Sequence, residues 1–158
     1  LRVLGRAVCI AAPAGCVIWL LAHCTLPGSE TLLQAAAAFL EAPGHLLGLS
    51  GPILLAFFLS LPANELMLPL CLLILCGGSL DAALPETAMA ATLAGCGWTW
   101  KTALCCMIFF LFHWPCGTSI ATIWRETRRW QTVLAAICLP TALGAALCFM
   151  LQWLLRLL

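Results

Sequence analysis

The chain has 158 residues, of which 64% are hydrophobic and only 8% charged. An ordinary soluble domain carries about 25% charged residues, so the composition predicts a membrane protein. Seven Lys and Arg against six Asp and Glu leave a formal charge of +1, which excludes the basic field that nucleic-acid binding requires. No motif of a serine hydrolase, a zinc protease or a P-loop nucleotidase occurs, so we expect no enzyme activity in this chain.

The first apolar run, Gly5 to Cys24, has the length of one membrane-spanning helix. Arg2 and Arg6 precede it, and the positive-inside tendency therefore places its start in the cytoplasm. The sequence begins at Leu1 rather than Met, and no signal-peptidase site closely follows the run. We therefore expect this chain to be a piece of a longer protein.

Residues 25 to 50 mix glutamate, glutamine and histidine with alanine and leucine. This pattern predicts an amphipathic helix over Thr31 to Glu41 that lies in the membrane interface rather than crossing it. Ser29 or Glu30 is predicted to cap this helix, and Pro43-Gly44 to end it.

A second apolar run extends from Pro52 to Cys76 and is interrupted at 61–65 by Leu-Pro-Ala-Asn-Glu. Pro62 removes a backbone donor and disfavours helix at the preceding residue. Asn64 is predicted to cap the second half of the run. Glu65 is an acid near mid-depth, where a charge costs at least ~2.5 kcal/mol, so the interruption predicts a functional site inside the membrane.

A loop over residues 77–81 and a short helix over 85–97 lead to a third apolar stretch, Trp98 to Trp124. That stretch is interrupted at 113–119, where the sequence reads His-Trp-Pro-Cys-Gly-Thr-Ser. Pro115 frees the carbonyl four residues before it, and the hydroxyls after it are predicted to cap a new half-helix. Two interrupted apolar stretches in one chain are typical of a transport site at the membrane midplane.

The cluster Arg-Glu-Thr-Arg-Arg at 125–129 is expected in water or among lipid head groups, and Gln131 to Leu155 is predicted to be the last span. Four full crossings would place this cluster outside, whereas the positive-inside rule places it inside. A re-entrant central run would return it to the cytoplasm, and the sequence leaves both topologies open.

The predicted fold class is therefore all-α, a polytopic helical membrane protein with two broken transmembrane helices. We divide it into a transmembrane region over residues 1–124, with breaks at 61–65 and 114–118, and a C-terminal region over 125–158. The C-terminal region holds the charged boundary and the last helix.

The interruptions supply the candidate site residues. Glu65 and Cys116 are predicted to lie on an ion path or gate, with Asn64 and Thr118 in support. Thiolate, carboxylate and carbonyl groups together suit a borderline divalent cation such as iron(II), zinc or manganese. The alternatives are that Glu65 and Asn64 form a polar pair that joins two helices, and that Cys116 acts as a small apolar side chain.

His113 follows Cys106 by seven residues, which places both on nearly the same helix face and permits a weaker metal site there. Polar packing beside Trp114 is the interpretation that we prefer for His113. Most of the eleven cysteines fall in apolar stretches, and none forms a Cys-x-x-Cys pair, so most are expected to pack as small hydrophobes.

Three segments of the chain carry a resemblance to a known family. They are Gly5-Arg6-Ala7 through Pro13-Ala14-Gly15 and Trp19, then Leu61 to Leu66 with Pro69, and then Pro115 to Thr118 followed by Arg125-Glu126-Thr127. In this order they resemble the second Gate domain and the C-terminal membrane region of the ferrous-iron transporter B family (FeoB). His113 departs from the tyrosine or other aromatic residue expected at its position.

The resemblance implies a multi-pass protein of the bacterial inner membrane that transports Fe²⁺ as its substrate, with no bound cofactor in this chain. It implies that GTP hydrolysis resides in a separate N-terminal domain. The implied partners are membrane lipid, that GTPase domain, a first Gate domain, small accessory Feo proteins and further copies of the chain in a homo-oligomer.

Two other classes remain open. Gate-type broken helices also occur in nucleoside transporters and in spore-maturation membrane proteins, which would recognise an organic solute through several polar side chains along the pore. A noncatalytic assembly subunit would use Glu65 only to hold helices together.

Overall fold

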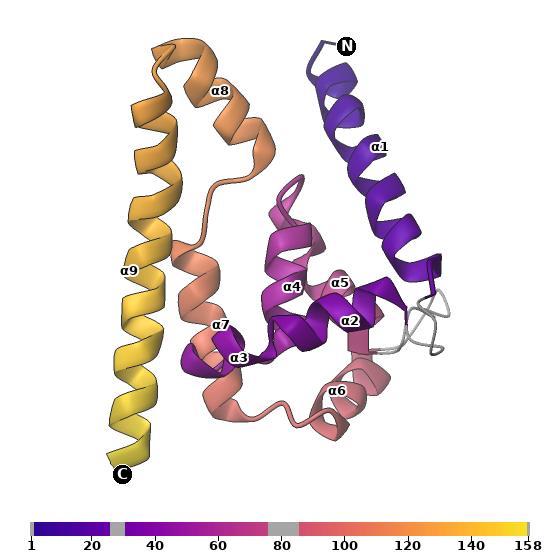
Figure 1. The fold of residues 1–158 in the computed structure, drawn as a ribbon, viewed down its shortest axis with the longest axis vertical. Coiled ribbons are helices and arrows are strands. Elements are labelled where there is room, and N and C mark those ends of the chain that lie inside the picture. Colours follow the sequence, from indigo (N-terminus) through magenta and orange to yellow (C-terminus); the bar gives the residue numbers. More distant parts are fainter. Residues whose placement is uncertain (1, 26–30, 76–85, 158) are drawn as a thin grey trace.

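The computed structural model describes residues 2–25, 31–75 and 86–157, and over these ranges the chain is helical without a β-strand (Figure 1). The predicted all-α class is confirmed. The helices are α1 (Arg2–His23), α2 (Leu32–Phe39), α3 (Glu41–Leu46), α4 (Gly51–Leu59), the 3₁₀ turn η1 (Asn64–Leu66), α5 (Met67–Leu75), α6 (Glu86–Gly95), α7 (Trp100–Phe112), α8 (Gly117–Thr127) and α9 (Trp130–Leu157).

The segment after α1 differs from its prediction in two details. Ser29 and Glu30 lie outside the described residues, and the residue that caps α2 is Thr31, whose hydroxyl accepts from the Gln34 N–H while the Gln34 side chain accepts from the Thr31 N–H. This reciprocal pair is a capping box. Pro43-Gly44 does not end the helical segment, because it lies inside α3, where a proline in the first turn loses no helical hydrogen bond.

The helix boundaries coincide with the first predicted interruption. Helix α4 ends at Leu59, the chain is non-helical to Ala63, and η1 and α5 follow. The predicted cap is wrong, because η1 begins after Ala63 without any side-chain cap and Asn64 is its first residue. The loop predicted at 77–81 lies outside the described residues.

The second predicted interruption also coincides with helix ends. Helix α7 ends at Phe112, α8 begins at Gly117, and the residues between them are extended or bent. After α8 the chain reverses at Arg128, whose backbone is left-handed with φ 52°, and α9 runs back past α8 and α7 (Figure 1). The predicted helices at 85–97 and 131–155 are confirmed as α6 and α9.

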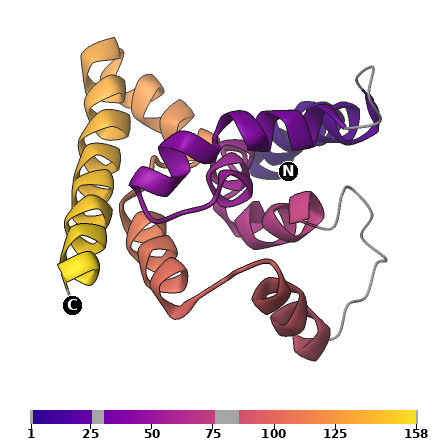
Figure 2. The same cartoon turned by 60° about the horizontal axis from the view of Figure 1, so that its bottom comes forward.

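The core lies between α4, α5 and α7, with α2 and α9 packed around it. Phe57 and Phe109 are almost wholly buried and meet edge to face, with ring centroids 4.9 Å apart. Cys71, Cys105 and Cys148 are also buried, as expected for thiols that act as small hydrophobes. Other cysteines of the described chain are exposed, namely Cys9, Cys16, Cys24, Cys96 and Cys138. Seen from below, α6 stands apart from the α7–α9 pair (Figure 2).

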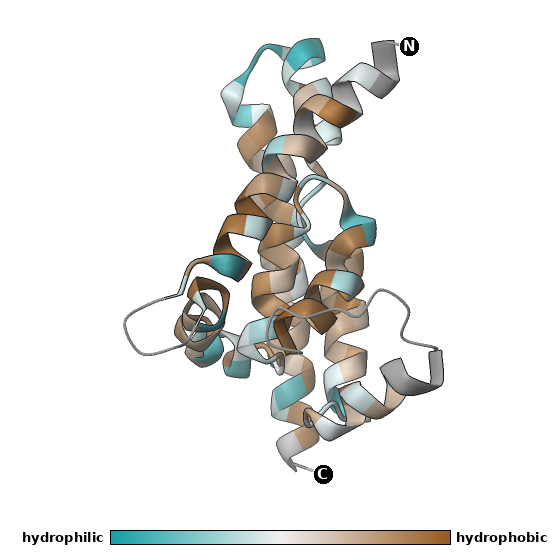
Figure 3. Ribbon diagram, turned by 90° about the vertical axis from the view of Figure 1, so that its right-hand side faces the viewer, coloured by the Kyte–Doolittle hydropathy of each residue, from teal (hydrophilic) through white to brown (hydrophobic). Residues whose placement is uncertain are grey.

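Two stretches of the described chain are long and apolar enough to span a membrane, Trp100–Thr127 and Trp130–Leu155. The first includes both halves α7 and α8. Hydrophobic residues cover most of the helices, and hydrophilic residues gather at the corner between α8 and α9 (Figure 3).

Candidate functional site

The two interruptions, distant in the sequence, touch each other in the structure. The backbone N–H of Gly117 donates a hydrogen bond of 2.7 Å to the carbonyl oxygen of Leu61. Beside this bond the rings of Phe58 and Trp114 stack, with centroids 4.8 Å apart and an interplanar angle of 28°. Gly117 is the first residue of α8, where a backbone N–H has no acceptor inside the helix, and Leu61 lies in the non-helical segment after α4. Each interruption therefore satisfies a backbone group of the other.

A groove of about 490 Å³ opens at this junction. Its polar lining comes from Asn64 in the first interruption and from His113, Trp114, Cys116 and Ser119 in the second, and α9 contributes Ala136 and Pro140. The structure therefore brings three of the predicted site residues, Asn64, His113 and Cys116, onto one surface.

Cys116 is the residue before the first turn of α8, with extended backbone angles of φ −62° and ψ 159°. Its sulfur lies 3.0 Å from the Thr118 hydroxyl and 3.2 Å from the Ser119 hydroxyl. Neither hydroxyl caps α8, because no side-chain cap bond is present there, so the predicted capping role is wrong. The hydroxyls instead surround the thiol, and hydroxyl donors favour the thiolate form that binds metals.

His113 has the orientation that metal-binding histidines commonly have. Its Nδ1 lies 2.7 Å from the Phe110 carbonyl oxygen, and since a carbonyl only accepts, Nδ1 carries the proton and donates. In the neutral ring Nε2 then holds a lone pair, and it is buried without a hydrogen-bond partner. A carbonyl that fixes one ring nitrogen while the other stays available is the usual support of a metal-ligating histidine.

Two further buried polar atoms at the groove lack a partner among the described residues. They are Oδ1 of Asn64, an acceptor, and Nε1 of Trp114, a donor. His113 and Trp114 are 8% and 7% exposed, and a buried polar atom without a partner costs about 1–3 kcal/mol. Such atoms collected on one groove indicate that a ligand or water meets them there.

The other predicted residues lie elsewhere. Glu65 is exposed on η1 and does not line the groove, and Cys106 is buried in the core. Thr118 is exposed and contacts the groove only through Cys116. Within the described ranges no group of three or more histidine, cysteine, aspartate and glutamate side chains is arranged to hold a metal, so a Cys106–His113 site has no third ligand of these types.

Ser119 and Trp114 were not named as candidate site residues in the sequence analysis. Ser119 stands three residues after Cys116, the spacing at which a side chain faces back to a helix-capping residue. That spacing is visible in the sequence. The contact of Trp114 with Phe58 depends on tertiary packing and has no sequence signal of its own.

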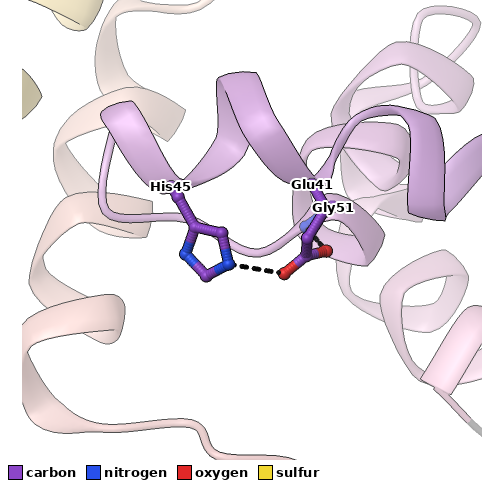
Figure 4. A network of polar contacts seen from close by, with 3 residues as sticks. All are labelled: Glu41, His45 and Gly51. Carbon is purple, nitrogen blue, oxygen red and sulfur yellow. Dashed lines mark hydrogen bonds and ion pairs between the residues drawn. The ribbon is translucent and has the colours of Figure 1, made fainter.

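A second pocket of about 460 Å³ lies between the α3–α4 turn, α9 and the segment before α7. Glu41 bridges two groups there (Figure 4): one carboxylate oxygen lies 3.0 Å from His45 Nε2, and the other accepts the Gly51 N–H at 2.7 Å. A carboxylate at the first N–H of α4 is favoured by the helix dipole. This arrangement therefore stabilises the entry into α4.

An all-helical chain with two long apolar stretches and interruptions that meet at a polar groove has the architecture of a membrane transport protein. The model of the Gate family, described as "Nucleoside recognition", matches residues 4–130, and the chain belongs to this family. The domain is found in ferrous-iron transporter B proteins and in nucleoside transporters. No curated protein and no solved structure matches the chain.

Proposed function

We propose that this chain is the membrane segment of a ferrous-iron uptake transporter, and that the groove at Cys116 forms part of the ion path or gate. The observation that carries the proposal is the placement of the Cys116 sulfur and the unpartnered His113 Nε2 on one groove. Thiolate and imidazole are ligands of borderline divalent ions. The side-chain oxygen Oδ1 of Asn64 adds an oxygen ligand from the other interruption.

In this proposal α7 and α8 are the halves of one broken transmembrane helix. Helices α4 and α5 pack side by side, so they are the two arms of a re-entrant hairpin. Glu65, exposed and next to Asn64, attracts the cation before it reaches the groove. GTP hydrolysis in another domain supplies the energy, and the protein lies in the bacterial inner membrane. Lipid covers the apolar outer faces of α1 and α9, and the first Gate domain, accessory Feo proteins and further copies of the chain complete the assembly.

The test is uptake of radioactive iron(II) by a strain that lacks its own ferrous-iron transporter and expresses the full-length protein. Cys116→Ser and Glu65→Ala are expected to reduce uptake at least tenfold without lowering the amount of protein in the membrane. Cys138→Ser is the matched control, because Cys138 is exposed on α9 and lines no groove at the interruptions. Uptake at the unmodified level in both path variants would contradict the proposal.

One observation favours a second candidate, a transporter of a nucleoside-like solute. Trp114 Nε1 is a donor and has no role toward a cation, whereas a donor, an acceptor and aromatic rings on one groove suit a polar organic ring. In this case, the full-length protein in the same strain would show saturable uridine uptake that iron(II) does not affect, and the same variants would be used to test the groove. An assembly subunit would show neither uptake, and Glu65→Gln would preserve its partner binding because an amide still joins helices.

A further inference from the structure

Helix α8 is amphipathic although it belongs to an apolar membrane-length stretch. At 100° per residue, Thr118, Ser119, Thr122, Arg125 and Glu126 fall within an arc of about 120°. The rest of the circumference holds Gly117, Ile120, Ala121, Ile123, Trp124 and Thr127. Thr127, the last residue of the helix, donates its hydroxyl to the Ile123 carbonyl. Along the helix axis, this polar face extends from the groove at Cys116, the residue before α8, to the charged corner before α9.

Three surface depressions follow this polar arc without a gap. The groove at Cys116 includes Ser119, a second depression is lined by Thr118, Ser119, Thr122 and Ile123, and a third by Thr122, Arg125, Glu126 and Arg128. Neighbouring depressions share Ser119 or Thr122, so they adjoin. The eleven residues of α8 span about 16 Å along the helix axis.

The hydroxyls on this face are exposed and keep hydrogen-bonding capacity. Thr122 donates to the Thr118 carbonyl at 2.9 Å, which leaves its oxygen free to accept. Polar side chains inside a membrane face water or protein rather than lipid. At the inner end of the face, the buried Nε2 of His113 and Nε1 of Trp114 have no partner in the described chain. At the outer end the charges of Arg125, Glu126 and Arg128 require water.

We infer that the polar face of α8 lines a water-filled passage that connects the charged α8–α9 corner to the Cys116 groove. The passage carries the transported solute, which under the proposed function is a hydrated divalent cation. The inference rests on a transport role but not on the identity of the solute. Glu126 shares the outer depression with Arg125 and Arg128, so the entrance has mixed charge and selection falls to the groove.

The passage can be tested by the rate at which MTSET, a charged and membrane-impermeant methanethiosulfonate reagent, modifies cysteines of the full-length protein in liposomes open to the reagent on both sides. Peptide mass spectrometry resolves each site, so the native cysteines serve as internal references. Native Cys116 is half-buried and native Cys138 is exposed on the outer face of α9. If exposure in the isolated chain determines the rate, MTSET modifies Cys138 faster. If a water-filled passage reaches the groove, MTSET modifies Cys116 faster.

We expect Cys116 to be modified at least tenfold faster than Cys138. In single variants, we expect Ser119→Cys and Thr122→Cys to react at least tenfold faster than Ala121→Cys, which is also exposed but lies on the apolar arc. Equal rates, or faster modification of Cys138 and Ala121→Cys, would overturn the inference. The comparison of native Cys116 with native Cys138 needs no substitution and is independent of how the variants fold.

Addition of Co²⁺, a divalent probe that does not oxidise in air as readily as iron(II), separates the passage from the proposed function. Slower modification of Cys116 in Co²⁺, with Thr122→Cys unchanged, supports both the passage and the metal path. An intact modification pattern without protection by Co²⁺ retains the passage and removes the iron proposal.

Discussion

The Gly117 N–H and the Leu61 carbonyl oxygen, 2.7 Å apart, form the hydrogen bond that joins the two interruptions. Gly117 is the first residue of α8 and the residue before it is extended, so both positions satisfy the backbone requirements of a proline at 117. Gly117→Pro therefore removes this donor while keeping the start of α8.

We expect Gly117→Pro to lower the free energy of unfolding by more than about 1 kcal/mol, the value of one hydrogen bond, because the proline ring also displaces the Leu61 carbonyl, and to reduce solute uptake at least tenfold. Thermal unfolding in detergent, followed by circular dichroism, and uptake in cells measure the two effects. Gly117→Ala keeps the donor and is the control. Unchanged uptake in the proline variant would show that the junction has no part in transport.

Asn64 offers a test of whether the groove is maintained for function at the expense of stability. Its Oδ1 is buried without a partner, and Asn64→Leu removes that unsatisfied acceptor while keeping the branching of the side chain. The variant is expected to unfold at a higher temperature, with about 1 kcal/mol more stability, and to lose uptake. A less stable Asn64→Leu protein would indicate that Oδ1 has a stabilising partner in the membrane.

Gly144 determines how closely α9 approaches α7. A Cβ at this position would lie 2.8 Å from the Phe112 Cβ, whereas a Cβ at Gly15 meets nothing within 4 Å. Both glycines are helical and gain similar helix propensity on substitution by alanine. Gly144→Ala should therefore be less stable than Gly15→Ala by about 1–3 kcal/mol, the cost of overpacking, in parallel thermal unfolding experiments. Equal stabilities would mean that α9 shifts freely.

The two contacts of Glu41, with the Gly51 N–H and with His45, are expected to contribute unequally to stability. Glu41→Ala removes the acceptor of the Gly51 N–H and is expected to cost about 1–2 kcal/mol. His45→Ala should cost less than about 1 kcal/mol, because the His45 side chain is 71% exposed. Glu41→Gln retains an acceptor oxygen and should fall between the two. An equal loss of unfolding free energy in Glu41→Ala and His45→Ala would show that the ion pair, rather than the bond to α4, stabilises this turn.

Local sequence signals predicted the helix ends well. Pro62 and Pro115 each restrict the residue before them and remove a donor, so the interruptions at 61–65 and 113–119 follow from single residues. The predicted cap of α2 was wrong although a local signal was present, because Thr31 and Gln34 have the Thr-x-x-Gln spacing of a capping box. Thr31 caps α2, whereas Asn64 caps nothing.

The composition of the groove could be predicted only in part. Proximity of the interruptions depends on how α4, α7 and α9 pack, which local patterns do not determine. The orientation of the His113 ring is set by its hydrogen bond to the Phe110 carbonyl. Asn64 and Glu65 are neighbours on η1, but Asn64 lines the groove whereas Glu65 is exposed outside it. Whether Glu65 and Cys116 serve one path stays a prediction.

The contact between Gly144 and Phe112 has a mechanical consequence. It leaves no space for a side chain where α9 meets the end of α7, so any larger residue at Gly144 must move the two helices apart. Helix α8, by contrast, is bounded by non-helical joints at residues 113–116 and at Arg128, and none of its side chains is fully buried. Substitutions on α8 are therefore expected to disturb packing less than a substitution at Gly144.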